Sequence, residues 1–232
     1  MVSFLEFQNV SAGYGEQRVL QNISFQLPTA CIHGLVGRNG QGKTTLLNLL
    51  RKYIRPFEGE ILFCGAEPRK EDIAMLEVEP FFYPRMTGSE YLRLVQFANP
   101  TFRAEAWNAI FDVPLEEEID TYSAGMRKKL AFMGVVGLRR PLVLLDEPFN
   151  SLDIETNYAL TDILKLLTEQ GTTVVLTSHI VEPLLAVSNT ILYLQQGDTI
   201  HHFSQQEFDR IHALMRSKEH TKNLALLRET MQ

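Results

Sequence analysis

Apolar and polar positions alternate along the first part of the chain and give way to continuous apolar runs further on. The alternation predicts strands over residues 2–10 and 19–27, joined by a turn at residues 11–15. A short strand between two turns is expected within residues 58–65. Other runs are almost entirely apolar, as in strands that a parallel sheet buries on both faces. These runs lie at residues 31–36, 142–145, 172–177 and 190–194.

Helical spacing of apolar residues appears between these strands. It predicts a helix over residues 43–53, a helical insert over residues 88–113 and a helix over residues 153–170. Ser204 and Glu207 form a capping box that opens a last amphipathic helix. Because strands and helices alternate, the expected fold is α/β with a mostly parallel central sheet.

The composition is that of an ordinary soluble protein. Of the 232 residues, 45% are hydrophobic and 22% are charged, and the formal net charge is −6. An acidic chain has no general attraction for nucleic acid or acidic lipid, so we expect no nucleic-acid partner. The N-terminus has no signal-peptide pattern, and the longest apolar stretch, residues 130–138, is too short to span a membrane. Cys31 and Cys64 lie in apolar segments, which predicts buried, reduced thiols.

The most specific motif joins the apolar run at residues 31–36 to the helix at residues 43–53. It is Gly37-Arg38-Asn39-Gly40-Gln41-Gly42-Lys43-Thr44-Thr45. Glycines in such a loop let successive backbone N–H groups converge on an anion at the positive end of a helix. Lys43 adds a charge for the outer phosphates, and the Thr44 hydroxyl is placed to bind Mg²⁺. The motif therefore predicts a phosphate-binding P-loop.

Two carboxylates end the apolar run at residues 142–145. Asp146 is suited to the Mg²⁺ shell, and Glu147 is suited to activating water, with a helix-capping or solvated acid as the alternative for Glu147. His179 follows the next strand-like run, where its imidazole either reaches a γ-phosphate or has only a structural role. Tyr14 is either an aromatic that packs in a turn or a surface on which a purine stacks.

A second anion site is expected where a small, serine-containing loop opens a helix. The stretch is Tyr122-Ser123-Ala124-Gly125-Met126-Arg127-Lys128-Lys129. At this point the chain resembles the ATP-binding cassette (ABC) ATPases. Residues 122–126 look like their LSGGQ signature, and Asn150-Ser151-Leu152-Asp153 looks like their D-loop. Tyr14 falls where their adenine-stacking aromatic lies, and His179 falls where their switch histidine lies.

The resemblance spans residues 4–197 and implies a P-loop NTPase fold of the ABC type. That fold has an N-terminal antiparallel β portion and a small helical subdomain beside the parallel sheet. The whole chain, residues 1–232, is then a single ABC ATPase domain. Its expected parts are a nucleotide-binding core at residues 1–80 and 140–203, a helical and signature subdomain at residues 81–139, and a C-terminal helical tail at residues 204–232.

The resemblance also implies a homodimer or heterodimer of ATPase subunits when ATP is bound. Each ATP, with its Mg²⁺, would lie between residues 37–45 of one subunit and residues 123–126 of the other. The residues that the resemblance assigns to metal binding and catalysis are Thr44, Asp146, Lys43, Glu147 and His179. In this family, ATP-driven closure powers membrane subunits. A separate transmembrane permease and a cytoplasmic position on the inner face of the cell membrane are therefore implied.

Two features depart from the family pattern. The signature has Ala124 in place of a glycine and Met126 in place of glutamine, and such an S-x-G-M signature looks like that of ABC-2-type exporters. Val78 stands where the family has glutamine or glutamate, and its side chain can neither bind Mg²⁺ nor hydrogen-bond water. We therefore expect Thr44, the phosphates and water to hold Mg²⁺, with Asp146 acting through water.

Glu77 and Glu79 flank Val78, and their side chains are expected to point away from its side of an extended loop. Glu79 is the weaker candidate for a direct metal ligand, and solvation of both glutamates is the alternative. Phe81-Phe82-Tyr83 follows. Three consecutive aromatic residues cannot all face one core, so we expect at least one to be exposed and to contact the membrane subunit. The alternative is that all of them pack the helical insert against the sheet.

The expected function is the ATPase subunit of an ABC-2-like exporter. The nearest alternative is the ATPase of a membrane or envelope complex that transports nothing. An ABC-type ATPase that acts on nucleic acid or ribosomes is a further alternative, which the acidic charge argues against. A nucleotide-binding regulator that barely hydrolyses ATP is the last one, and Glu147 argues against it.

Overall fold

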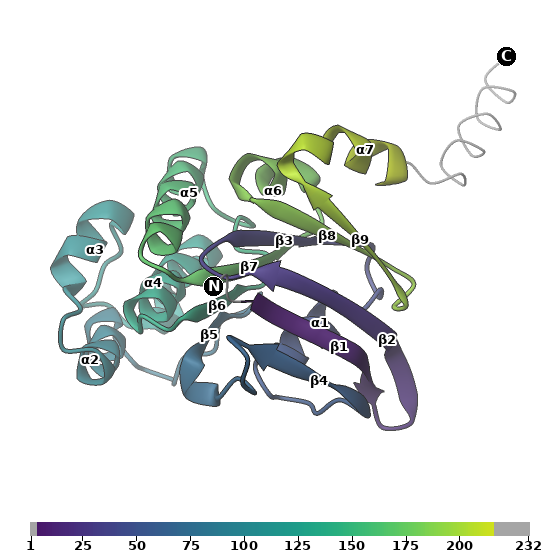
Figure 1. The fold of residues 1–232 in the computed structure, drawn as a ribbon. Helices are drawn as coiled ribbons and strands as arrows, with labels where there is room; N and C mark the ends of the chain where they lie inside the picture. Colours follow the sequence, from purple (N-terminus) through teal and green to yellow (C-terminus); the bar gives the residue numbers. More distant parts are fainter. Residues whose placement is uncertain (1–3, 216–232) are drawn as a thin grey trace, which may run out of the picture.

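The computed structural model describes residues 4–215, which form two β-sheets and the helices around them (Figure 1). The smaller sheet is antiparallel, with the strand order β2-β1-β4. Its strands are β1 (Phe4–Tyr14), β2 (Gln17–Pro28) and β4 (Glu58–Phe63). The larger sheet has the order β5-β6-β7-β3-β8-β9. Its strands are β3 (Ile32–Val36), β5 (Ile73–Leu76), β6 (Leu142–Leu145), β7 (Thr173–Ser178), β8 (Thr190–Gln195) and β9 (Thr199–Ser204).

Neighbouring strands of the larger sheet are parallel from β5 to β8, and β9 is antiparallel to β8. This arrangement confirms the expected α/β fold with a mostly parallel sheet. The α-helices are α1 (Lys43–Leu50), α2 (Gly88–Ala98), α3 (Ala104–Phe111), α4 (Ala124–Gly137), α5 (Ile154–Glu169), α6 (Val181–Val187) and α7 (Asp209–Met215). Short 3₁₀ turns lie at η1 (Lys70–Asp72), η2 (Ile119–Thr121) and η3 (Gln205–Glu207).

Both faces of the larger sheet are buried. On one face, Leu35 and Val175 pack with the leucines of α1 and with the smaller sheet. On the other face, Val36 and Leu176 pack with apolar residues of α4, α5 and α6. Side chains on both faces of these strands therefore leave water, which explains why the strands appear in the sequence as continuous apolar runs.

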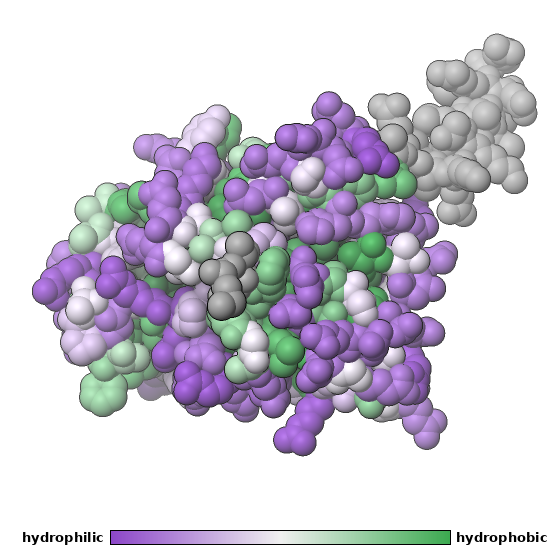
Figure 2. Space-filling model, in the orientation of Figure 1, coloured by the Kyte–Doolittle hydropathy of each residue, from purple (hydrophilic) through white to green (hydrophobic). Residues whose placement is uncertain are grey.

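The predicted helical insert is confirmed as two helices, α2 and α3, which pack with α4 at one end of the molecule (Figure 1). Trp107 stacks on Phe111, and Phe111 meets Phe132 of α4 edge-to-face with ring centroids 5.8 Å apart. Leu94 and Phe97 are exposed at this end, where Figure 2 shows apolar patches. The boundaries of the core and of the helical subdomain stay a prediction.

The turn predicted at residues 11–15 is wrong. Strand β1 continues to Tyr14, and only Gly15 and Glu16 form the turn. Gly13 pairs with Arg18, and a Cβ atom on Gly13 would lie 1.8 Å from the carbonyl oxygen of Gln17. The glycine at position 13 therefore permits close strand pairing, which in the sequence looks the same as a turn.

Two other expectations need correction. The helix predicted over residues 43–53 ends at Leu50, because Arg51 is its C-cap and Lys52 has a positive φ of 60°. Cys64 is exposed in the turn after β4, where its φ is 55°, so the buried thiol predicted at this position is wrong. Cys31 is half-buried, and burial raises the pKa of its thiol.

Several elements had no counterpart in the sequence prediction, namely β5, β9 and α6. The capping box at Ser204 and Glu207 is present, with Glu207 accepting a hydrogen bond from the Ser204 amide at 3.2 Å. It opens the 3₁₀ turn η3, and α7 begins two residues after that turn. Residues 216–232 of the predicted C-terminal tail lie outside the described residues.

His33 is a fully buried polar residue in the centre of the larger sheet. Its Nε2 lies 2.8 Å from the carbonyl oxygen of Pro28, and its Nδ1 lies 2.7 Å from the Thr190 hydroxyl. A carbonyl only accepts, so Nε2 carries the proton and Nδ1 accepts from the hydroxyl. Burial, more than the nearby His202, lowers the pKa of His33 to about 4.

We predict that His33 makes the fold sensitive to acid. The unfolded chain binds a proton near pH 6.5 and the folded chain only near pH 4, so the stabilisation is complete above pH 6.5 and is lost as the pH falls towards 4. The loss reaches about 3 kcal/mol, from 1.36 kcal/mol for each pKa unit. Urea unfolding at neutral and acidic pH measures it. His33→Leu should show a smaller loss of stability on acidification, and an equal loss in both proteins would contradict the prediction.

Candidate functional site

The glycine loop joins β3 to α1, as the motif predicts. Gly42 is the N-cap of α1, with φ 103°, and a Cβ atom there would lie 2.7 Å from Leu20. Both the backbone angle and the close contact require glycine at this position. The Gly42 carbonyl accepts the first helical hydrogen bond, from Leu46 at 2.9 Å. The loop therefore turns directly into a helix N-terminus, whose free N–H groups attract anions.

Lys43 points back over this loop. Its Nζ donates to the carbonyl oxygens of Gly37 at 2.6 Å and Arg38 at 3.2 Å. The Arg38 amide donates to Oε1 of Gln41 at 2.6 Å. Burial lowers the pKa of Lys43, whereas the charges of Glu147 and Asp146 oppose that shift. A cation therefore lies at the mouth of the loop, held by weak carbonyl partners that a phosphate can replace.

Asp146 follows the last residue of β6 and is 7% exposed. The Thr177 hydroxyl, on the neighbouring strand β7, donates to Asp146 Oδ1 at 2.5 Å and accepts from the backbone amide of Glu147 at 3.0 Å. Burial, and to a lesser degree Glu147, raises the pKa of Asp146, while the Thr177 hydrogen bond, Lys43 and Lys128 counter that shift. Thr177 thus holds both the carboxylate of Asp146 and the backbone amide of Glu147.

Glu147 has a positive φ of 50°, which turns its side chain away from the direction of the strand. Its Oε2 lies 2.9 Å from Nδ1 of His179 and accepts from Nδ2 of Asn150 at 3.3 Å. Its side chain is 13% exposed, whereas that of His179 is 51% exposed. The two residues predicted to act on water and on the γ-phosphate therefore contact each other.

Lys128 is a residue of the site to which the sequence assigned no role. It is 4% exposed on α4, and its Nζ donates to the Glu147 carbonyl oxygen at 2.8 Å. In the sequence it lies within Arg127-Lys128-Lys129, and a basic run of this kind is usually a solvated helix face.

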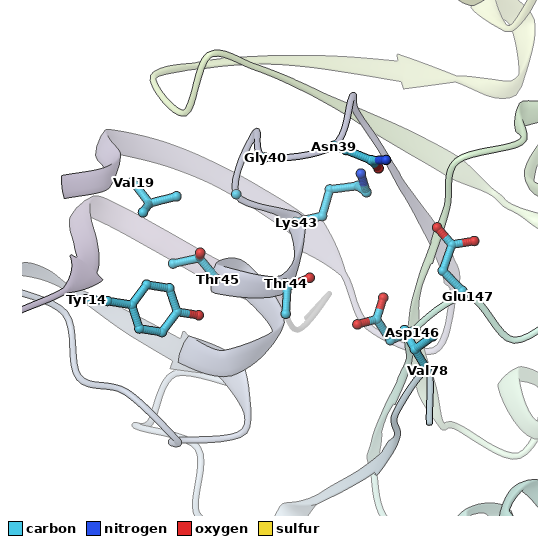
Figure 3. A pocket seen from close by; sticks show the side chains of 11 residues that line it. Tyr14, Val19, Asn39, Gly40, Lys43, Thr44, Thr45, Val78, Asp146 and Glu147 are labelled. Carbon is cyan, nitrogen blue, oxygen red and sulfur yellow. The ribbon is translucent and has the colours of Figure 1, made fainter. Parts of the chain in front are cut away.

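A cavity of about 450 Å³ brings most of the predicted site together (Figure 3). Its lining residues are Tyr14, Val19, Asn39, Gly40, Gly42, Lys43, Thr44, Thr45, Val78, Asp146 and Glu147. The sequence did not point to Val19. Gly37, Arg38, Gln41 and His179 are not among the lining residues. The first three belong to the loop, and His179 contacts Glu147. The cavity therefore joins an aromatic ring, a phosphate-binding loop and two carboxylates.

The predicted signature, residues 123–126, does not line this cavity. Ser123 is the N-cap of α4, and its Oγ accepts from the Met126 amide at 3.2 Å. A Cβ atom on Gly125 would lie 2.8 Å from the carbonyl oxygen of Ser151, so the signature packs on the loop before α5. Asp153 caps α5 through the Thr156 amide at 2.7 Å, and this hydrogen bond, with the Lys129 ion pair, lowers the pKa of Asp153 to about 2.

The family model described as ABC transporter matches residues 20–150, which is more than half of the chain. This chain belongs to the ABC transporter family. It is an ATP-binding subunit, and the ATP-binding subunits of ABC transporters are ATPases.

Among ABC transporter relatives, the ATP-binding protein YtrB of Bacillus subtilis is 30% identical over 83% of this chain and 69% of that protein. The SkfA peptide export ATP-binding protein SkfE of the same species is 24% identical over 90% of this chain and 92% of that protein. Other relatives are named for import. A solved ATP-binding subunit of an ABC transporter has a TM-score of 0.82 and 24% identity, covers 97% of this chain and 99% of its own, and supports the fold.

In ABC transporters, ATPase subunits work with transmembrane components. None of the helices within residues 4–215 of this chain is long and apolar enough to cross a membrane. The residues of the cavity fit a bound Mg²⁺, because the Thr44 hydroxyl and the Asp146 carboxylate both line it. Hard oxygen atoms of this kind are the ligands that Mg²⁺ prefers.

Val78 lies at the wall between this cavity and a second one of about 370 Å³, and it lines both, with Thr44 and Asp146. Glu77 forms an ion pair with Arg51 and lines the second cavity, so its interpretation as a simply solvated residue is wrong. Glu79 also lines the second cavity. Val78 therefore lies at the nucleotide cavity, and its correspondence to the family's glutamine stays a prediction.

We predict that Glu147→Gln keeps ATP binding and lowers steady-state hydrolysis at least about 100-fold, because it removes the carboxylate that accepts a proton from water. Lys43→Ala should instead weaken ATP binding, since it removes a cation beside the loop. Isothermal titration and phosphate release measure the two effects separately. Undiminished hydrolysis in the Glu147 variant would remove this residue from the chemistry.

Proposed function

We propose that this chain is the ATPase subunit of an ABC-2-like exporter and acts through ATP-driven closure of a dimer. The observation that carries the proposal is that only one of the two anion-binding helix N-termini lies at the nucleotide cavity. The glycine loop faces the cavity of its own chain, whereas the α4 N-terminus at Ser123 does not line it. A second subunit that brings its own α4 N-terminus to this cavity adds the positive helix end that one chain does not supply.

The residues of the cavity support a direct route for hydrolysis. ATP binds with its phosphates on residues 37–45, and Lys43 moves from the loop carbonyls to the outer phosphates. Glu147 orients a water for attack on the γ-phosphorus and takes its proton as the bond to the leaving ADP oxygen breaks. His179, held by Glu147 at 2.9 Å, donates to the γ-phosphate. Mg²⁺, held by Thr44 and through water by Asp146, would neutralise charge on the phosphate oxygens.

Export is favoured over import by the signature and by one relative. Ala124 and Met126 give the S-x-G-M pattern of ABC-2-type exporters. SkfE, which is named for peptide export, is matched over 92% of its own length. Other relatives are named for import, so import is the alternative outcome of a transport assay.

The membrane partner is proposed to be a separate permease that contacts residues 81–83 on the cytoplasmic side of the cell membrane. Phe81 and Tyr83 are 73% and 63% exposed, with ring centroids 5.5 Å apart, whereas Phe82 is 6% exposed. Phe82 packs edge-to-face on Tyr91. Two paired, exposed aromatic rings on a segment anchored by a buried third one suit an interface hot spot.

A complementation experiment tests the dimer. A Lys43→Ala subunit mixed with a Ser123→Arg subunit should restore one composite site, because each variant supplies the half that the other lacks. The mixture should hydrolyse ATP at about half the wild-type rate or less, from counting sites. Each variant alone should be inactive while melting as a folded protein. A proven heterodimer without rescue would show that each subunit works alone.

Substitution of the exposed aromatic residues tests the partner contact. Phe81→Asp and Tyr83→Asp should each reduce co-purification with the membrane subunit at least about tenfold, as expected when a hot-spot aromatic is lost. Purified ATPase activity should stay near wild type. Phe97→Asp is the matched control, because Phe97 is 91% exposed on α2. Full assembly in both test variants, or an equal loss in the control, would place the interface elsewhere.

A further inference from the structure

Helix α1 contains a buried amide between leucines. Asn48 is 6% exposed, and the residues on either side, Leu47 and Leu49, are 0% and 3% exposed. Asn48 also lines the second cavity, together with Thr44 and Asp146. Burying an amide costs free energy unless the amide is hydrogen-bonded. The Asn48 Oδ1 has no hydrogen-bond partner among the described residues, so part of this cost is not offset. A leucine would fill the site without that cost, and the asparagine therefore calls for a functional explanation.

The hydrogen bond that Asn48 does make leads out of the core to the nucleotide cavity. Its Nδ2 donates to the Tyr14 hydroxyl oxygen at 2.8 Å. Tyr14 is the last residue of β1, directly before the turn at Gly15, and it is 44% exposed. Its ring lines the cavity (Figure 3). A side chain so exposed at the end of a strand samples several rotamers unless something holds its far end.

The position of Asn48 on α1 links this contact to the phosphate-binding residues. Asn48 lies four residues after Thr44, so the two side chains are on the same face of one helix. The N-terminal turn of that helix carries Lys43 and Thr44, which line the cavity on its phosphate side. The aromatic wall and the phosphate-binding residues are therefore both fixed to α1.

We propose that Asn48 is a positioning residue that orients the Tyr14 ring for the purine base of a nucleoside triphosphate. This inference rests on the proposed ATP binding and on the stacking role that the family resemblance implies for Tyr14. The hydrogen bond holds the ring against the cavity before the nucleotide arrives, so the bound state loses less conformational freedom on stacking. Asn48 is not among the residues that line the nucleotide cavity. It acts through Tyr14, and the position requires tyrosine because phenylalanine has no atom for Asn48 to hold.

The test is a double-mutant cycle on the full chain. Tyr14→Phe keeps the ring and removes the hydroxyl, and Asn48→Leu keeps the helix and fills the core. Titration calorimetry with Mg²⁺ measures binding of a non-hydrolysable ATP analogue and, separately, of inorganic tripolyphosphate. Each single variant should bind the analogue about three- to tenfold more weakly, and the double variant no more weakly than either single variant. Binding of tripolyphosphate should stay at the wild-type value in all three.

Three results would overturn the inference. The first is unchanged binding of the analogue in Tyr14→Phe, which is conservative enough to fold. The second is an additive loss in the double variant, which would mean that the two residues act separately. The third is an equal loss for tripolyphosphate, which would mean that Asn48 supports the phosphate loop. Tyr14→Ala tests the stacking role itself: full binding of the analogue by that variant would reject base stacking and leave the proposed ATPase function standing.

Discussion

The hydroxyl of Thr177 is the contact on which the geometry of the site depends. It bridges β7 to the end of β6 by donating to Asp146 and accepting from the Glu147 amide. Parallel pairing brings Leu145 opposite Leu176, so the residues that follow β6 and β7 leave the sheet at the same edge. Strand β3 pairs with β7 on its other side and delivers the glycine loop to that edge. Three segments distant in sequence meet there because the strands share one register.

Two lysines and two carboxylates lie together at this edge before any nucleotide binds. Burial lowers the pKa values of Lys43 and Lys128, and the charges of Glu147 and Asp146 oppose this shift. Each ammonium also rests on backbone carbonyls, Lys43 on the loop and Lys128 on Glu147. A carbonyl is a weaker partner than a phosphate, and Lys43 is the lysine that lines the cavity. The arrangement thus leaves one cation ready for exchange and keeps the other as a structural tie between α4 and the carboxylates.

Most of the site was predictable from sequence, because its motifs directly follow strands whose two buried faces give continuous apolar runs. The strands β5 and β9 were missed for the opposite reason, since a four-residue strand and a polar edge strand carry no clear periodicity. Lys128 was missed because the sequence does not show which side of a basic helix turn faces the sheet. The turn predicted at residues 11–15 was wrong because the sequence does not distinguish a glycine that allows close strand approach from a glycine in a turn.

An ion pair next to Val78 links helix α1 to the segment that leads to the exposed aromatic rings. Val78 lines the nucleotide cavity, but its side chain makes no polar contact there. The residue before it, Glu77, pairs with Arg51, which is the C-cap of α1 and lies 4.5 Å from the ring centre of Tyr53. Helix α1 therefore begins at the phosphate loop and ends at an ion pair with the segment that leads to Phe81. An ion pair at the far end of that helix therefore joins the nucleotide-binding helix to the segment with the exposed aromatic rings.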